Sequence, residues 1–338
     1  MIDASDPASQ KKVVKEVVEL LSDGNVVALP TETVYGLGAD ALNADAVAKV
    51  FAAKERPEFD PLIVHVGYYE QVDQVAEVPD ELRELVDKLM KAFWPGPLTL
   101  VLPKKDCVPS IVTSGLSSVA VRMSGHPIMK AIVRGLGNPI AAPSANRFGR
   151  ISPTSASAVV KELGGRISAI VDGGACREGL ESTIIRPEAG DKKPILHLLR
   201  AGPITKELLQ RFGKVERPKK PRSNEAPEAP GQLASHYAPT TPLRLLKSPE
   251  DFQPERGKKY GLLSYCGAEK AGFINLHEWD VVEELSPGNG KLAEAAVRLF
   301  FVLRKLDESG VDEIIAEPVS ETGLGVAIMD RLRRASVN

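Results

Sequence analysis

The amino-acid sequence predicts an α/β protein with two domains. Short apolar runs alternate with stretches of helical periodicity through residues 1–213, a pattern typical of strands and helices in turn. Several of these runs lie close enough in the chain to pair as hairpins, so we expect a twisted, open, mixed sheet with helices. Residues 214–242 are rich in proline and charge and predict a linker. The alternation resumes over residues 243–338, which predict a second, smaller α/β domain.

The individual elements are predicted from local patterns. Val13, Val17 and Leu21 recur at helical spacing before Gly24, and the apolar run 26–29 then predicts a buried strand. By the same reasoning we expect helices over 44–53 and from residue 80, and strands over 62–66, 98–102, 119–123, 140–142, 167–171, 183–185 and 195–199. Beyond the linker we expect a Rossmann-like unit with strands over 243–246, 260–265 and 311–316, a helix over 291–307 and a terminal helix.

The composition is that of a soluble globular protein. Of the 338 residues, 43% are apolar and 26% are charged, which excludes wholesale disorder. The net charge of −2 excludes the basic surface of a dedicated nucleic-acid-binding protein. No window approaches the roughly 18 apolar residues of a membrane span, and the three cysteines lack the spacing of a zinc or redox site. We therefore expect a cytoplasmic protein with reduced thiols and no membrane association.

A polar segment that contains two glycines follows the strand at 26–29. Residues 30–40 read Pro-Thr-Glu-Thr-Val-Tyr-Gly-Leu-Gly-Ala-Asp, and loops that follow strands often line sites. Gly36 and Gly38 give a partial match to the dinucleotide-binding fingerprint, which would indicate an oxidoreductase. That fingerprint needs an immediate turn where this chain has polar residues, so we discount the match.

Two further pairs of residues suggest a site for a polyphosphate. Lys54 and Arg56 end the second predicted helix, where their charges either face the helix dipole or together hold a polyphosphate. Ser144 and Asn146 follow a buried strand, where α/β sheets open their ligand crevices, and both offer short hydrogen-bonding groups.

Together these segments resemble the YrdC-type domain of the L-threonylcarbamoyladenylate synthase family. The resemblance rests on Lys54-x-Arg56, Ser144-x-Asn146, residues 30–37 and the Gly-Pro-Leu-Thr of residues 96–99, and it covers about residues 8–212. Residues 231–239, Gly-Gln-Leu-Ala-Ser-His-Tyr-Ala-Pro, extend it to the long form of the family, which has an added C-terminal domain. The linker lacks the Ser-Pro-Gly-Met that often precedes His-Tyr-Ala-Pro in the family, so its nucleotide contacts stay open.

The resemblance implies an enzyme, a nucleotidyltransferase. Members of the family condense L-threonine, bicarbonate and ATP into threonylcarbamoyl-AMP and pyrophosphate, and a separate transferase complex then passes the threonylcarbamoyl group to adenosine in tRNA. A carbamate oxygen attacks the α-phosphorus as pyrophosphate leaves, which needs cations and donors placed in advance, with Mg²⁺ on the triphosphate. The basic cluster within residues 214–222 is most simply part of a solvated linker and otherwise a weak tRNA contact.

The resemblance also implies roles for individual residues. Lys54 and Arg56 match the catalytic cations of the family. The implied ATP contacts are Lys54, Arg56, Thr113, Ser144, Asn146, Ser152, Arg200, His236 and Tyr237. The implied threonine contacts are Thr33, His65, Arg122 and Ser182, of which Arg122 would bind the α-carboxylate. His236 and Tyr237 would help the linker close as a lid over the adenylate, or would only dock the second domain.

Three other functions stay open on the sequence. YrdC-like domains also occur in carbamoyltransferases that use another acceptor, although the acylphosphatase and zinc-finger signatures of those proteins are not visible here. A module that binds RNA without catalysis is disfavoured by the net charge. The oxidoreductase rests on Gly36 and Gly38 alone.

Overall fold

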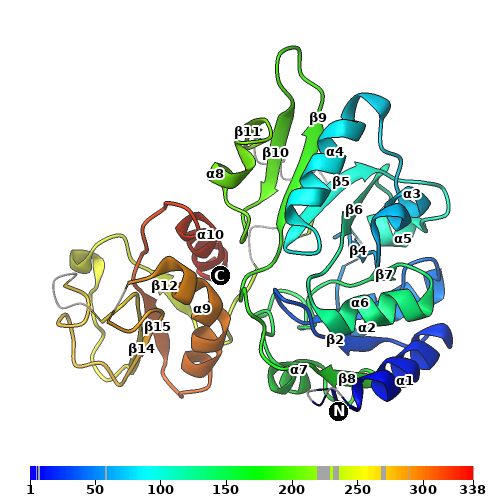
Figure 1. Ribbon diagram of the computed structural model, residues 1–338. Helices are drawn as coiled ribbons and strands as arrows, with labels where there is room; N and C mark the ends of the chain where they lie inside the picture. Colours follow the sequence, from blue (N-terminus) through cyan, green and yellow to red (C-terminus); the bar gives the residue numbers. More distant parts are fainter. Residues whose placement is uncertain are drawn as a thin grey trace. The chain divides into compact units, whose positions relative to one another are not determined.

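The computed structural model describes residues 1–4, 6, 8–57, 59–218, 229–230, 236–267, 272–288 and 290–337 (Figure 1). The chain forms two compact units. The first comprises Met1–Phe148, Pro153–Arg177 and Glu181–Leu233, and the second comprises Gly149–Ser152, Glu178–Leu180 and Ala234–Asn338. Two short segments from the middle of the chain thus belong to the second unit. The predicted domain boundaries at residues 213 and 242 place both segments in the first domain. Much of the predicted linker, residues 219–228 and 231–235, lies outside the described residues.

The first unit is built on a mixed sheet that has eleven strands within the described residues. In sheet order they are β1 (Ile2–Asp3), β8 (Ala169–Asp172), β2 (Val27–Leu29), β3 (Gly36–Asp40), β7 (Ile140–Ala141), β4 (Ile63–His65), β6 (Ser118–Arg122), β5 (Leu98–Pro103), β9 (Thr183–Glu188), β10 (Ile195–Arg200) and β11 (Lys214–Glu216). β4 pairs with β6 in parallel, whereas β5 pairs with β6 antiparallel. The prediction of a mixed sheet is confirmed.

Helices cover both faces at the end of the sheet that contains β2. α1 (Gln10–Ser22) and α6 (Pro127–Leu136) pack side by side on the face that carries Val27 and Leu29 (Figure 1). α2 (Ala44–Lys54) and α7 (Ala156–Leu163) pack on the opposite face, which carries Ala28. This division follows from the period of two in a strand, which sends successive side chains to opposite faces.

At the other end of the sheet the two faces differ. The other described helices of this unit are η1 (Tyr69–Gln71), α3 (Val72–Val75), α4 (Asp80–Phe93), α5 (Ser110–Thr113) and α8 (Lys206–Leu209). Of these, α3, α4 and α5 pack on the face that carries Val64 and Val121. The opposite face carries a smaller apolar cluster of Ile63, Val101, Ala120, Ile184, Leu199 and Ala229. Because residues two apart in a strand share a face, His65 of β4 and Arg122 of β6 lie on this second face.

The second unit contains a four-stranded sheet whose described pairs are all parallel. Its order is β12 (Leu243–Leu245), β15 (Glu313–Ala316), β13 (Tyr260–Ser264) and β14 (Val281–Glu284). α9 (Leu292–Asp307) connects β14 to β15, since parallel strands need a crossover, and η2 (Pro249–Asp251) and α10 (Gly325–Ala335) complete the unit. The prediction of a second, smaller α/β domain is confirmed.

The segment around Gly36 and Gly38 differs from its predicted loop conformation. It forms β3, in which a Cβ at Gly38 would lie 2.9 Å from Leu29 Cδ1 and 3.0 Å from Ile140 Cγ2. These glycines therefore serve close packing within the sheet and make no turn for a pyrophosphate. The oxidoreductase hypothesis loses the one feature on which it rested.

Candidate active site

Lys54 is the last residue of α2, and its side chain turns inward instead of reaching into solvent. Glu55 adopts the left-handed conformation, with φ of 54°, and ends the helix. The buried Lys54 ammonium donates to the backbone oxygens of Ser144, at 2.5 Å, and Asn146. Burial, and next the charge of Arg56, lower the pKa of Lys54 well below its usual value. A polyanion beside this ammonium would favour its charged form, so the group is suited to a phosphate.

A buried carboxylate, Asp60, lies close to three cations. The Arg56 guanidinium pairs with Asp60 Oδ2 at 2.8 Å and donates to the backbone oxygens of Asp60, at 3.1 Å, and Pro61, at 3.0 Å. Burial raises the pKa of Asp60, and this rise is opposed by the positive charges of Arg56, Lys54 and Arg200. The buried carboxylate of Glu162 also acts on Lys54, so three cations face two carboxylates and leave a net positive charge at this place. Asp60 was not predicted from the sequence, although Arg56 lies only four residues away, because a sequence does not distinguish a buried counter-ion from a surface acid.

Ser144, Asn146 and Thr113 are the predicted nucleotide contacts of the first unit that carry no charge. Ser144 and Asn146 follow β7 and present their backbone oxygens to Lys54. Thr113 ends α5, which packs against α2, and its hydroxyl donates to the backbone oxygen of Leu116 at 3.0 Å. The structure thus brings Lys54 into contact with the Ser-x-Asn segment, and the role of these residues toward a nucleotide stays a prediction.

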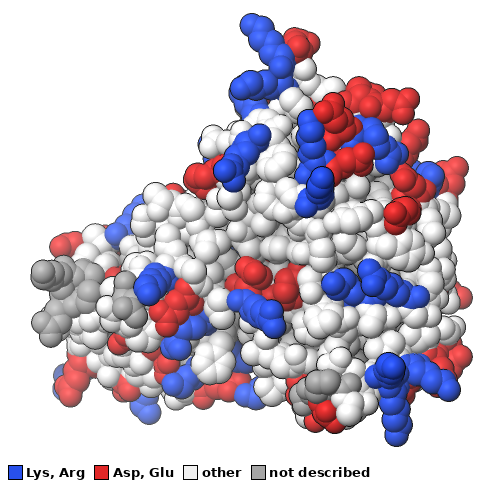
Figure 2. Space-filling view, in the orientation of Figure 1, with Lys and Arg blue, Asp and Glu red and all other residues white. Residues whose placement is uncertain are grey.

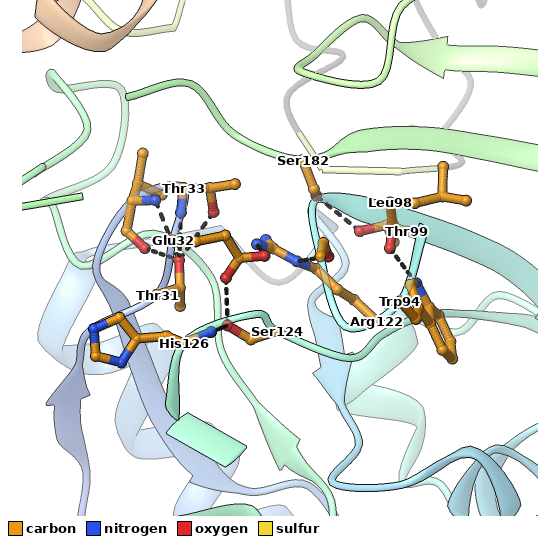
Figure 3. A network of polar contacts seen from close by, with 12 residues as sticks. Thr31, Glu32, Thr33, Trp94, Leu98, Thr99, Arg122, Ser124, His126 and Ser182 are labelled. Carbon is orange, nitrogen blue, oxygen red and sulfur yellow. Dashed lines mark hydrogen bonds and ion pairs between the residues drawn. The ribbon is translucent and has the colours of Figure 1, made fainter. Parts of the chain in front are cut away.

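Arg122 is paired with Glu32, a residue that the sequence analysis did not assign. Arg122 Nη2 donates to Glu32 Oε1 at 2.6 Å, and Ser124 Oγ donates to Glu32 Oε2 at 2.5 Å (Figure 3). Arg122 Nε donates to the backbone oxygen of Gly96 at 3.2 Å. Burial alone would raise the pKa of Glu32, but the charge of Arg122 and the hydrogen bonds from Ser124 and Arg122 outweigh it and lower the pKa to about 2. Glu32 is therefore ionised at neutral pH, and it holds the Arg122 guanidinium in place.

Thr33 lies in a turn that Thr31 organises. Thr31 Oγ1 accepts from the backbone N–H groups of Thr33, at 3.1 Å, and Val34, at 3.2 Å, and lies 2.9 Å from Thr33 Oγ1. Bonds from a hydroxyl to nearby backbone groups hold a turn that has no regular secondary structure. The loop on either side of Glu32 is therefore held in one conformation by its own hydrogen bonds. Figure 3 draws Thr31 and Thr33 beside Glu32 and Arg122.

Ser182 precedes β9 and joins two other polar side chains. Its hydroxyl lies 2.7 Å from Thr99 Oγ1, and Arg200 Nη2 donates to the same Ser182 Oγ at 3.0 Å (Figure 3 draws Thr99 and Ser182). Arg200 Nε donates to the backbone oxygen of Ser182 at 3.0 Å, and Nη1 donates to that of Pro230 at 3.3 Å. Arg200, predicted to contact ATP, thus positions Ser182, predicted to contact threonine. Because the charge of Arg200 also acts on Asp60, the two groups of residues adjoin.

His65 lies in β4, in register with Arg122 of β6. Burial, and next the charge of Arg122, lower the pKa of His65 to about 3. The ring is therefore neutral at physiological pH and offers one donor and one acceptor but no charge. Its Nδ1 is buried and has no hydrogen-bond partner among the described residues. A neutral ring of this kind suits a hydroxyl or amine group better than a carboxylate.

Three of the predicted nucleotide contacts, Ser152, His236 and Tyr237, belong to the second unit, and all are buried. Tyr237 has φ of 64°, and its ring centroid lies 5.5 Å from that of Phe300 and 5.4 Å from the guanidinium of Arg331. These contacts fix the end of the predicted linker to α9 and α10 within that unit.

We expect replacement of His65 by glutamine to remove part of the acid sensitivity of the first unit. The pKa of His65 is about 3 in the fold against 6.5 as a model value, so its contribution is fully present above pH 6.5 and is lost as the pH falls toward 3. At pH 5 this loss amounts to about 2 kcal/mol. Urea unfolding at pH 7.5 and pH 5 should show a smaller difference in unfolding free energy for His65→Gln than for the parent. An equal difference in both proteins would contradict a buried, neutral His65.

The described residues show neither a cluster of metal ligands nor a membrane-spanning helix, and their cysteines form no disulfide. No group of three or more His, Cys, Asp or Glu in that part of the chain is placed to hold a metal ion. No helix there is long and apolar enough to cross a membrane. All three cysteines are free, with Cys107 exposed, Cys176 buried and Cys266 half-buried.

Comparison with known proteins identifies the family. A family described as "Telomere recombination" matches residues 19–202, and one described as "Threonylcarbamoyl-AMP synthase, C-terminal domain" matches residues 204–337. The threonylcarbamoyl-AMP synthase of Bacillus subtilis (strain 168) is 43% identical over 99% of this chain and 96% of its own length. That of Pyrococcus abyssi (strain GE5 / Orsay) is 42% identical over 94% of this chain and 92% of its own length. The crystal structure of P. abyssi Sua5 complexed with L-threonine superposes with a TM-score of 0.85 at 38% identity, over 99% of this chain and 97% of that one. The chain belongs to the threonylcarbamoyl-AMP synthase family, in the form that carries the C-terminal domain.

Proposed function

We propose that this protein condenses L-threonine, bicarbonate and ATP to threonylcarbamoyl-AMP and pyrophosphate. The observation that carries the proposal is the pair of adjoining subsites in the first unit. One gathers Lys54, Arg56 and Arg200 near the carboxylate of Asp60, with the buried Glu162 also acting on Lys54, which still leaves an excess of positive charge. The other holds Arg122 against Glu32. A net positive subsite suits a triphosphate, and a guanidinium that a carboxylate holds in place suits an amino-acid carboxylate.

In the proposed reaction the amine of threonine first combines with bicarbonate to form a carbamate, and one water molecule leaves. A carbamate oxygen then attacks the α-phosphorus while the bond to pyrophosphate breaks, so no covalent bond to the protein is needed. Lys54 and Arg56 stabilise the charge that develops on the phosphorus oxygens and on pyrophosphate. Mg²⁺ enters bound to ATP, as part of the substrate.

Threonine is proposed to lie on the face of the sheet that carries Arg122 and His65. Arg122 takes the carboxylate, and the neutral ring of His65 takes the hydroxyl or the amine. Thr33 and Ser182 supply hydroxyl groups from either side of Arg122. The P. abyssi relative was crystallised in complex with L-threonine, which supports an amino-acid subsite in this fold.

The described part of the linker supports a role at the site. Ala229 is fully buried in the apolar cluster on the same sheet face, and the backbone oxygen of Pro230 accepts a hydrogen bond from Arg200. We propose that the linker closes over the nucleotide and excludes water from the mixed anhydride. Such closure would make the linker more resistant to proteolysis when ATP and threonine are present than when they are absent.

The product is proposed to pass to a separate threonylcarbamoyl transferase that modifies tRNA, in the cytoplasm. The free thiols are in keeping with a reducing compartment. On the face drawn in Figure 2, basic and acidic side chains are interspersed, so any tRNA contact on this face is weak.

Pyrophosphate release tests the proposal. We expect the full-length protein with MgATP to release pyrophosphate only when L-threonine and bicarbonate are both present, because the nucleophile is built from both. Omission of either should reduce the rate to background. Release without threonine, or with bicarbonate rigorously removed, would contradict the proposed reaction and favour another acceptor.

A further inference from the structure

Glu32 is a buried carboxylate that accepts a hydrogen bond at each of its two oxygens and has no role in the proposed reaction. It accepts from Arg122 Nη2 at 2.6 Å and from Ser124 Oγ at 2.5 Å, and it is only 9% exposed (Figure 3). Gly125 lies directly behind it, where a Cβ would be 3.5 Å from Glu32 Cδ. The burial, the ion pair and the close packing fix the carboxylate in one position.

Glu32 is poorly suited to act as a base. Its charged form is stabilised by an ion pair and by hydrogen bonds from both sides, and these also lower its pKa to about 2. A carboxylate of that acidity takes a proton from an ammonium or bicarbonate group only with difficulty. Its effect must therefore act through the groups that it holds.

The group that it holds is the Arg122 guanidinium. Nη2 is used toward Glu32 and Nε toward the backbone oxygen of Gly96, whereas Nη1 makes no hydrogen bond to the described residues. A guanidinium has five N–H groups, so Nη1 keeps two and Nη2 keeps one. Two parallel N–H groups on Nη1 and Nη2 form the fork that a carboxylate accepts.

Glu32 also sets the charge of its subsite. Arg122 with Glu32 is electrically balanced, whereas Lys54, Arg56 and Arg200 near Asp60 leave an excess of positive charge. The triphosphate is therefore attracted to Lys54, Arg56 and Arg200. Arg122, whose charge Glu32 balances, selects its ligand by the geometry of its two parallel N–H groups.

We propose that Glu32 is a positioning residue that holds the free edge of Arg122 toward the substrate and so makes the threonine subsite selective for an α-carboxylate. The inference rests on the proposed function for the identity of the amino acid. It goes beyond that function in assigning the selectivity to a residue that touches Arg122 and not the substrate.

Binding of two ligands tests the proposal independently of turnover. Calorimetric titration of the full-length protein compares L-threonine with L-threoninamide, which keeps the amine and hydroxyl but lacks the carboxylate. We expect Glu32→Gln to lower the preference for L-threonine over L-threoninamide by about tenfold, through weaker binding of threonine alone. Ser124→Ala removes only one of the bonds to Glu32 and should lower the preference by about two- to threefold.

A merely structural role for Glu32 would weaken both ligands equally and leave their ratio unchanged, which would overturn the proposal. If Glu32→Gln does not fold, the proposal is tested with Ser124→Ala. An unchanged ratio of the affinities for L-threonine and L-threoninamide in that variant would equally overturn the proposal. Should the ratio fall as expected while the parent releases no pyrophosphate, the proposed reaction fails and the role of Glu32 in carboxylate selection stands.

Discussion

Replacing Lys54 with alanine is expected to lower the rate of pyrophosphate release by about a hundredfold or more. The ammonium is buried, and charge that is fixed in a water-poor site stabilises a developing anion more strongly than it would in solvent. The same burial makes the charge costly to the free protein, as the lowered pKa of Lys54 shows. Removing the side chain relieves that cost while it leaves the oxygens of Ser144 and Asn146 without their donor, so we expect a modest net change in stability.

Lys49 provides a matched control for this substitution. It lies in the same helix, is exposed, and donates to the backbone oxygen of Gly24 at 2.7 Å. Lys49→Ala should retain nearly full activity. If Lys54→Ala turns over within a few-fold of the parent at saturating ATP, threonine and bicarbonate, Lys54 only ends the helix and has no role in catalysis.

Replacing Gly202 with alanine is expected to destabilise the first unit by roughly 3 kcal/mol and to weaken threonine binding. A Cβ at this position would lie 2.5 Å from the backbone oxygen of Glu181, 2.6 Å from the nitrogen of Thr183 and 2.8 Å from the carbonyl carbon of Ser182. All three are backbone atoms, so the start of β9 must move. That movement displaces Ser182 from Arg200, which it contacts through two hydrogen bonds.

Gly125 serves as the control, because a Cβ there meets its nearest neighbour, Glu32 Cδ, at an ordinary 3.5 Å. Gly125→Ala should change the unfolding free energy by less than about 1 kcal/mol. Urea unfolding followed by intrinsic fluorescence compares the two variants. Equal stability of Gly202→Ala and the parent would show that the chain relaxes around the new methyl group without cost.

The strands and helices could be predicted from the sequence where apolar residues repeat at a regular spacing. The prediction failed where glycine stands in place of an apolar residue. The runs at 26–29 and 119–123 became β2 and β6 within a residue or two, since buried strands need consecutive apolar side chains. β3 was missed because Gly36 and Gly38 carry no side chain that would reveal the period of two. The assignment of residues 149–152 and 178–180 to the second unit depends on tertiary contacts and has no local signal.

The candidate site also contains residues that could be predicted from the sequence and residues that could not. The cations Lys54, Arg56 and Arg122 were chosen because they stand in short motifs that can be recognised along the chain. Their carboxylate partners, Asp60 and Glu32, were not assigned, since nothing in the sequence tells a buried counter-ion from a surface acid. Glu32 and Arg122 are 90 residues apart and meet only because β6 and the loop after β2 converge.

Isotope labelling of the adenylate shows whether threonine and bicarbonate both enter the product. The full-length protein is incubated with MgATP, ¹³C-bicarbonate and ¹⁵N-threonine, and the nucleotide product is examined by mass spectrometry. We expect one product, threonylcarbamoyl-AMP, that carries both labels together with the AMP moiety and is formed in equal amount with pyrophosphate. An adenylate that contains the nitrogen label but lacks the bicarbonate carbon, or ADP and phosphate in its place, would contradict it.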